Sequence, residues 1–309
     1  MKLGRFGCAV KIAVGVLLLA LIVYGLARGA VFSSHPYVGT PTPELPPGIL
    51  WHLGPVPISN TMVTAWISMS ILTVLFALGT RKMKLVPRGL QNLLEWVVET
   101  LMNLVEDSVG KEKGRRFLPV IATIFLFVFV NAWMGLVPFF GAFGLWEETA
   151  EGHSVLVPIL RPANTDLNFT LALAIVSFVF VEYLGISHHG FFRYAGKFVK
   201  VGPLFGGFRK LFTGKIKSGL SAVFMGAIEA FVGVIEFISE FVRLLSFSFR
   251  LFGNMTAGEI LLLIGFFLAP FVVPLFFYSL ELLVGLIQAA VFAMLTMVFA
   301  AMATAEHEH

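Results

Sequence analysis

The sequence has little charge and almost no cysteine. Lys, Arg, Asp and Glu make up 13% of its 309 residues, whereas hydrophobic residues make up 58%. Soluble globular proteins carry about 25% charged residues, so this chain has too few charges to cover a soluble surface of its size. Its high hydrophobicity also excludes an intrinsically disordered chain. The single cysteine, Cys8, excludes a disulfide framework and a Cys-based metal cage within the chain.

Motifs of several functional classes are missing as well. The formal net charge of +4 is too small to indicate a general nucleic-acid-binding protein. No HExxH, Walker or GxSxG motif occurs. The sequence contains two close histidine pairs. His188 and His189 lie beside basic residues, and His307 and His309 lie in a polar tail. In such places histidines are more often surface residues than metal ligands. We therefore expect no metal, no cofactor and no catalytic apparatus in this chain.

Long apolar runs predict helices that cross a membrane. About 20 apolar residues span the hydrocarbon core of a bilayer. The uncharged run 61–79 meets this length, and further spans are predicted within 117–138, 167–186, 219–269 and 276–303. The sequence therefore predicts an all-α polytopic membrane protein with five core membrane helices in a lipid bilayer.

Two segments outside these spans have patterns of their own. Residues 90–105 place apolar side chains at helical spacing with acidic residues between them, which predicts an amphipathic helix on the membrane surface. Residues 1–11 are basic and precede the apolar run 12–27, which fits either a first membrane helix or a cleaved signal sequence. Residues 33–57 are rich in Pro and Gly and predict an extended loop. We divide the chain into an N-terminal segment, 1–60, and a polytopic domain, 61–309.

The segment 219–269 is too long for a simple crossing. It contains no proline, and as one helix it would be about 75 Å long, whereas the bilayer core is about 30 Å thick. The residues alone allow either two crossings or one strongly tilted helix. Pro270 and Pro274 predict the turn into the last helix.

Positive charges predict the orientation of the chain in the membrane. Loop 80–116 has eight Lys and Arg residues and loop 187–218 has seven, whereas loops 28–60 and 141–166 have one each. The positive-inside rule places the basic loops and the N-terminus in the cytoplasm and the acidic loop 141–166 outside. A single crossing by 219–269 returns the C-terminus to the cytoplasm, and a double crossing leaves it outside.

Seven charged residues lie within the last two predicted membrane segments. Each costs at least about 2.5 kcal/mol at the bilayer centre, so such residues are functional candidates. Glu240 precedes Arg243 by three positions and can pair with it on a helix, whereas Arg250 has no carboxylate within one turn. Arg250 therefore requires a partner on another helix or another chain. The seven residues are Glu229, Glu236, Glu240, Arg243, Arg250, Glu259 and Glu281.

Glu259 and Glu281 lie in two successive helices, and antiparallel packing can bring them together. Two carboxylates in one site of low dielectric raise each other's pKa, which suits a proton relay. The alternative is a structural pair that is hydrogen-bonded within the hairpin. The residues alone favour neither. Asn254 and Gln288 add polar groups that can hold water.

Several motifs together resemble subunit a of the F-type ATP synthase. Residues 250–259 (RLFGNMTAGE) are similar to that family's signature around an essential arginine, and residues 288–292 (QAAVF) are similar to its final helix. Residues 162–168 (PANTDLN) and 131–138 (NAWMGLVP) resemble two further family segments. The likeness extends from about residue 61 to the end, and residues 1–60 show none.

The resemblance implies a proton-translocating stator that couples proton flow to ATP synthesis. Its partners would be the c-ring, the peripheral-stalk subunit b and the other ATP synthase subunits, which would carry the ATP chemistry. It also implies a bacterial cell membrane location, a single tilted helix at 219–269 and a cytoplasmic C-terminus.

The family's functional residues map onto this sequence. The essential arginine corresponds to Arg250, between an outer and a cytoplasmic half-channel. At position 281, where many members have histidine, this chain has glutamate. The outer half-channel would contain Asn254, Glu259, Glu281, Gln288 and, as a weaker candidate, Asp166, and the cytoplasmic one would contain Glu236 and Ser239.

A secondary transporter is the main alternative class. Such proteins are often built from inverted repeats with broken helices near the membrane midplane. No repeat relates the two halves of this sequence. The sequence therefore favours the stator over the transporter.

Overall fold

The computed structural model confirms an all-α membrane fold. It describes residues 2–30, 46–137, 144–148, 154–198 and 216–305, so parts of the predicted loops and the polar tail lie outside the described residues. Five helices in the described part are long and apolar enough to cross a membrane. They are α2 (Asn60–Thr80), α4 (Lys111–Met134), α5 (Leu167–His189), α8 (Ile216–Leu268) and α9 (Val273–Ala303).

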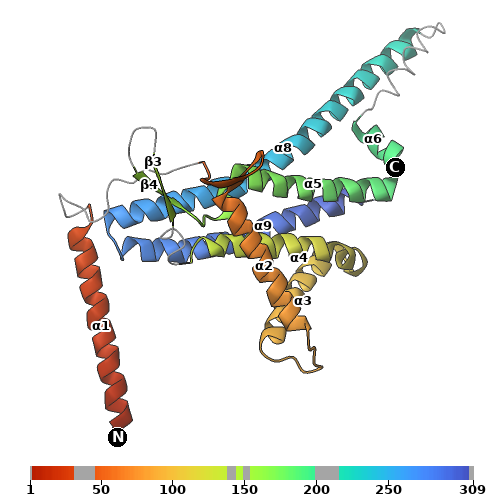
Figure 1. The fold of residues 1–309 in the computed structure, drawn as a ribbon. Coiled ribbons are helices and arrows are strands. Elements are labelled where there is room, and N and C mark those ends of the chain that lie inside the picture. Colours follow the sequence, from red (N-terminus) through yellow and green to blue (C-terminus); the bar gives the residue numbers. More distant parts are fainter. Residues whose placement is uncertain (1, 31–45, 138–143, 149–153, 199–215, 306–309) are drawn as a thin grey trace. The chain divides into compact units, whose positions relative to one another are not determined.

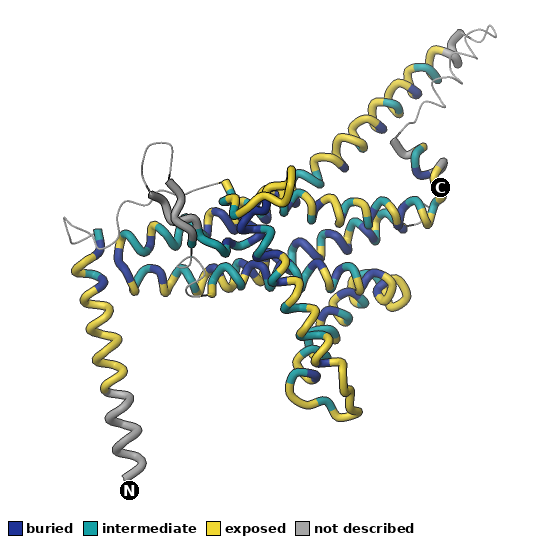
Figure 2. Tube along the Cα trace, viewed as in Figure 1, coloured by how far each residue is buried: buried dark blue, intermediate teal, exposed yellow. Residues whose placement is uncertain are grey.

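The long segment before the proline turn is a single helix. Helix α8 runs unbroken for 53 residues, about 80 Å at 1.5 Å per residue, and Figure 1 traces it without interruption. Its described side chains from Leu220 to Val242 are mostly exposed and apolar (Figure 2). The turn after Leu268 contains Phe271 at a φ of 70°, and Pro274 lies in the first turn of α9, where its missing N–H leaves no bond unmade.

The amphipathic helix is also confirmed. Helix α3 (Leu90–Val109) is preceded by Gly89 and followed by Gly110, both with positive φ, a conformation that glycine adopts without strain. It buries Leu101 and Val105, whereas Glu99 and Asp107 are exposed. The half-buried Glu95 accepts a hydrogen bond from Gln91, and the half-buried Glu106 pairs with Arg115.

Some elements were not predicted. The segment expected as an extended loop contains a hairpin of β1 (Ile49–Leu53) and β2 (Val56–Ser59), and the acidic loop contains a second hairpin of β3 (Gly144–Glu148) and β4 (Ser154–Pro158). A short 3-10 helix, η1 (Ala163–Thr165), precedes α5, and α6 (Phe191–Phe198) follows it. The sequences of both hairpins lack the sustained alternation of apolar and polar residues by which strands are predicted.

The chain divides into two compact units. Unit 1 comprises residues 1–73, 127–166 and 251–289, and unit 2 comprises 74–126, 167–250 and 290–309. Helices α2, α4, α8 and α9 each contribute residues to both units, whereas α3, α5 and α6 belong to unit 2.

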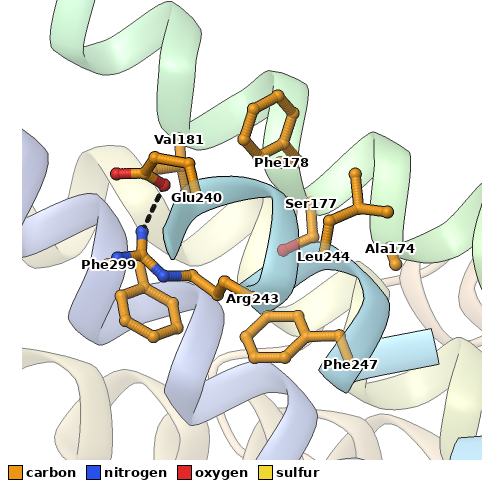
Figure 3. Close-up of a pocket in the computed structure, with 9 residues that line it drawn as sticks. All are labelled: Ala174, Ser177, Phe178, Val181, Glu240, Arg243, Leu244, Phe247 and Phe299. Atoms are coloured by element: carbon orange, nitrogen blue, oxygen red, sulfur yellow. Dashed lines mark hydrogen bonds and ion pairs between the residues drawn. The ribbon is translucent and has the colours of Figure 1, made fainter. Parts of the chain in front are cut away.

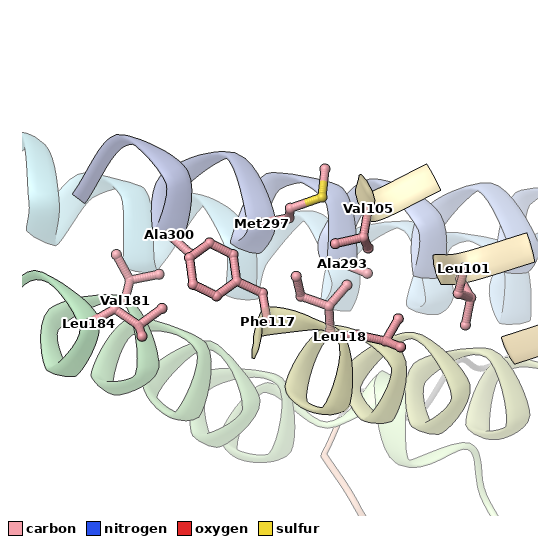
Figure 4. Close-up of a cluster of buried hydrophobic side chains, with 10 residues drawn as sticks. Leu101, Val105, Phe117, Leu118, Val181, Leu184, Ala293, Met297 and Ala300 are labelled. Carbon is pink, nitrogen blue, oxygen red and sulfur yellow. The ribbon is translucent and has the colours of Figure 1, made fainter. Parts of the chain in front are cut away.

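Unit 2 has an apolar core in which four helices meet. Phe117 and Met297 are almost completely buried there, next to Val105 of the amphipathic helix (Figure 4). Lys113 donates a hydrogen bond to the carbonyl of Thr304 at 3.1 Å, just beyond the end of α9. The core cluster is Leu101, Val105, Phe117, Leu118, Ile121, Val181, Leu184, Ala293, Met297 and Ala300.

Within unit 1, the C-terminal end of the N-terminal helix α1 (Lys2–Arg28) packs against the turn between α8 and α9. A Cβ at Gly25 would overlap the Pro270 carbonyl, and one at Gly29 would overlap the Leu268 carbonyl. The Ala30 N–H donates to the Phe267 carbonyl at 3.0 Å. Two glycines four residues apart thus allow α1 to approach the backbone of the α8–α9 turn, as in GxxxG helix contacts. Its described apolar side chains before this contact are exposed (Figure 2).

Candidate functional site

Unit 1 buries an unusual number of polar side chains for an apolar protein. Thirteen of its polar or charged residues are less than 10% exposed. Because buried polar groups require hydrogen-bond partners and are costly in a membrane, this concentration makes the region the candidate functional site. These residues are Ser59, Asn60, Thr61, Thr64, Ser68, Asn131, Arg161, Asn164, Thr165, Asp166, Thr256, Glu281 and Gln288.

Asp166 is anchored at the beginning of α2. The hydroxyl of Thr61 donates to Asp166 Oδ2 at 2.8 Å, and the hydroxyls of Thr61 and Ser59 are 2.7 Å apart. The side-chain amide of Asn60 donates to the Pro158 carbonyl at 3.0 Å. Asp166, which was predicted as a weaker candidate, therefore belongs to a hydrogen-bonded network.

Glu259 pairs with an arginine from a distant segment. Both Nε and Nη2 of Arg161 donate to Glu259 Oε2, at 3.2 and 2.9 Å. Sequence reasoning missed this pair because 98 residues separate its members. The only signal was a lone arginine in an otherwise acidic loop, directly before the PANTDLN motif.

Glu281 lies against the helix that carries Glu259. It is 7% exposed, and a Cβ at Gly258 would overlap its carboxyl group, so the glycine provides the space that this carboxyl occupies. Among the described residues, Glu281 has no ion pair or hydrogen bond. The structural hypothesis of a hydrogen-bonded Glu259–Glu281 pair is therefore wrong, because Glu259 takes its hydrogen bonds from Arg161.

Asn254 and Gln288 form a direct hydrogen bond across the hairpin. The Asn254 amide donates to Gln288 Oε1 at 2.7 Å, so the structure brings two of the predicted residues together. Nε2 of Gln288 and the hydroxyl of Thr256 are buried without a partner in the described protein. The same holds for three other atoms of unit 1, Ser68 Oγ, Asn131 Oδ1 and Asn164 Oδ1. Orphaned polar atoms of this kind fit a hydrated interior.

The structure confirms the predicted ion pair of Glu240 and Arg243, which lies in unit 2. Nη1 of Arg243 donates to Glu240 Oε2 at 2.6 Å, and the guanidinium carbon lies 3.8 Å from the centre of the Phe299 ring. Figure 3 shows both contacts at the edge of a small cavity between α5, α8 and α9, of about 10 Å³. Such a volume is close to the smallest that holds one water molecule. Arg243 is thus neutralised locally.

Helix α6 contains an ionisable residue, Tyr194, that is hydrogen-bonded to Glu182 of α5. Burial, together with the Glu182 carboxylate to which Tyr194 is hydrogen-bonded, raises the pKa of the Tyr194 phenol well above its usual value. The ring of Tyr194 packs where a Cβ on Gly185 would lie. The phenol therefore stays protonated over the physiological pH range and fixes α6 against α5.

Arg250 has a different environment from Arg243. Its side chain is exposed, and no described residue forms an ion pair or hydrogen bond with its guanidinium group. The other two residues predicted with it in unit 2 are Glu236, which is half-buried, and Ser239, whose hydroxyl donates to the Ile235 carbonyl at 2.8 Å. A cation in a membrane helix without an internal partner is available to a partner chain.

Comparison with known proteins supports the class of protein that these structural features define. The fold and the buried ionisable groups define a multi-pass membrane protein of the ion-conducting kind. The family model described as ATP synthase A chain matches residues 62–301.

Curated relatives match over most of their length. The chain is 35% identical over 261 residues to ATP synthase subunit a of Gloeobacter violaceus, covering 84% of this chain and 90% of that protein. It is 32% identical over 252 residues to ATP synthase subunit a of Moorella thermoacetica, covering 82% and 94%. For the same subunit of Trichlorobacter lovleyi the identity is 34% over 241 residues, covering 78% and 85%. The chain belongs to the ATP synthase subunit a family.

Proposed function

We propose that this chain is the stator of a rotary proton channel, with two half-channels separated by Arg250. As a member of the subunit a family it is a membrane-sector subunit of an F-type ATP synthase, and its partners are other subunits of that complex. The finer proposal names the c-ring and the peripheral-stalk subunit b as direct partners, a bacterial cell membrane as the location and a cytoplasmic C-terminus.

The distribution of the predicted residues supports two half-channels. The outer candidates, Asp166, Asn254, Glu259, Glu281 and Gln288, all belong to unit 1, whereas Glu236 and Ser239 belong to unit 2. Three of the outer candidates, Asp166, Glu281 and Gln288, belong to the buried polar cluster of unit 1, whereas Asn254 is exposed and Glu259 is half-buried. Protons would enter along these hydrated groups, reach a carboxylate of the ring and leave past Glu236 and Ser239 after nearly one rotation.

The observation that carries the proposal is the contrast between two arginines of α8. Arg243 is paired with Glu240 and stacked on Phe299, whereas Arg250 is exposed and has no partner among the residues that the structure describes. A fixed positive charge favours the ionised form of a carboxylate that approaches it. Arg250 would therefore make a ring carboxyl release its proton and would prevent protons from passing directly between the half-channels. Arginine suits this role because it stays charged when desolvated.

The test is ATP-driven acidification of inverted membrane vesicles at equal levels of assembled complex. Arg250→Ala should abolish acidification, and Arg243→Gln, in the same helix, should retain at least a third of the wild-type rate. Normal pumping by the Arg250→Ala complex would contradict the proposal. A complete block by Arg243→Gln in a fully assembled complex would mean that the wrong arginine had been assigned.

A further inference from the structure

The connection between the membrane helix α2 and the amphipathic helix α3 is rich in positive charge. Residues 81–89, the α2–α3 corner, belong to unit 2 and contain four basic residues and no acidic one. The first carboxylate after the corner is Glu95, which accepts a hydrogen bond from Gln91 at 2.7 Å. All four basic side chains are exposed, and none of them forms an ion pair within the described part of the chain. They are Arg81, Lys82, Lys84 and Arg88.

The backbone of the corner is held in place by α3. Gln91 is buried, accepts the Lys84 N–H through Oε1 at 3.1 Å and donates through Nε2 to the Lys84 carbonyl at 2.9 Å. A Cβ at Gly79 would overlap Leu94, so the last turn of α2 packs directly on α3. The fold therefore fixes which side chains the corner presents.

The corner also presents large apolar side chains between its cations. Leu85 is fully exposed, and Met83 and Val86 are 66% and 69% exposed. Exposure of such side chains to water is unfavourable, so a less polar environment is expected to cover them. Helix α2 has 21 residues, which corresponds to about 30 Å, the thickness of the bilayer core. Because the corner begins directly after Thr80, it lies at the level of the lipid headgroups.

We propose that the α2–α3 corner binds anionic phospholipids. The phosphate groups would contact the four basic side chains, and the acyl chains would cover Met83, Leu85 and Val86. Charge complementarity selects this partner, because a neutral lipid covers the apolar side chains but leaves the cations without a counter-charge. The positive-inside rule predicts that the leaflet is the cytoplasmic one. This site lies outside the predicted half-channels and does not depend on the role of Arg250.

The experiment measures which lipid lies next to Leu85 in the complete complex. Cys8→Ser/Leu85→Cys, in a complex without other reactive cysteines, carries a small fluorophore at position 85. The complex is reconstituted in phosphatidylcholine vesicles in which one fifth of the lipid carries a nitroxide quencher on its acyl chain. We expect spin-labelled phosphatidylglycerol to quench the fluorophore at least twofold more strongly than spin-labelled phosphatidylcholine. Equal quenching by the two lipids would overturn the proposal. Absence of quenching by both would overturn it too, since a partner chain would then cover the corner.

Two variants with the same loss of charge test the location of the site. Lys82→Gln/Lys84→Gln should lose at least half of the preference for phosphatidylglycerol. Lys111→Gln/Arg116→Gln, at exposed positions early in α4, should keep it, because those residues lie beyond the other end of α3. An equal loss in both variants would mean that the overall charge of the chain, and not the corner, attracts the lipid.

A salt titration tests the same contact without a charge substitution. Raising the salt concentration from about 0.1 M to about 1 M shortens the screening length from about 10 Å to about 3 Å. The preference for phosphatidylglycerol should then fall by at least half. A preference that does not change with salt would contradict an electrostatic contact. The readout is fluorescence and not pumping, so this proposal and the stator proposal can fail separately.

Discussion

At the scale of single residues, distance along the chain decided what could be predicted. The Glu240–Arg243 pair was predicted because its members are three positions apart on one helix. The Arg161–Glu259 pair was not, because no local rule connects an arginine in a loop with a glutamate 98 residues later. For the same reason the space that Gly258 leaves for Glu281 could be found only in the structure.

The paired arginine should matter for stability more than for transport. Arg243→Gln leaves the Glu240 carboxylate buried without its cation, and we expect a loss of about 2 kcal/mol. This is less than the 3–5 kcal/mol of a fully buried pair because a quarter of the Arg243 side chain is exposed. The thermal midpoint of the purified complex measures this loss, and Glu240→Gln/Arg243→Gln should restore part of it. An unchanged midpoint in the single variant would show that the pair contributes nothing to stability.

The contact between Gly258 and Glu281 gives a second prediction at this scale. Gly258→Ala places a methyl group where the carboxyl of Glu281 lies, so Glu281 must move and pumping should slow at least tenfold. Gly253→Ala in the same helix is the matched control, because no described atom beyond the adjoining turns of α8 lies within 4 Å of the added methyl group. Equal pumping rates for the two variants would show that the position of Glu281 is not critical.

At the scale of elements, apolar length and helical period were reliable guides. The five spans and the amphipathic helix occur where the sequence predicts them, although α4 begins at Lys111, within charged residues. Charge alone does not end a helix, so a hydropathy pattern places the apolar centre of a span better than its ends. The strands β1 to β4 were missed because short hairpins in Pro- and Gly-rich or acidic loops carry a weak period-2 signal.

The end of α1 provides the prediction at this scale. Gly29→Leu should separate α1 from the α8–α9 turn, because a Cβ there would already overlap the Leu268 carbonyl. Gly15→Leu is the control, since nothing lies within 4 Å of that position. We expect the first variant to lower the thermal midpoint of the complex by several degrees and the second to leave it unchanged. Equal midpoints would show that α1 does not depend on this contact.

At the scale of the whole molecule, polar groups are concentrated in unit 1. Sequence motifs identified most of the ionisable residues there. They also contain Asn131 and Asn164, but gave these amides no role, and Ser68 lies in no motif. Single Ser, Thr and Asn residues in apolar helices are common, and only the fold shows which of them gather in one unit.

This concentration predicts different access to water in the two units. In a Cys8→Ser background, Thr256→Cys in unit 1 should react with a small water-soluble thiol reagent, because the Thr256 hydroxyl is buried without a protein partner. Thr296→Cys in unit 2 should react at least tenfold more slowly, since Thr296 is completely buried and its hydroxyl lies 2.7 Å from that of Ser177. Similar reaction rates would contradict a hydrated unit 1.

The exposed Arg250 also has a consequence for biogenesis. A lone arginine costs at least about 2.5 kcal/mol at the centre of a bare bilayer, and a carboxylate on a neighbouring chain removes much of that cost. In the proposed function the ring supplies this carboxylate, because no described residue of this chain forms an ion pair with Arg250. Under that proposal the chain would be more stable in a bilayer that already contains the ring than in one without it. Copies without the ring would then be the better substrates for membrane proteases.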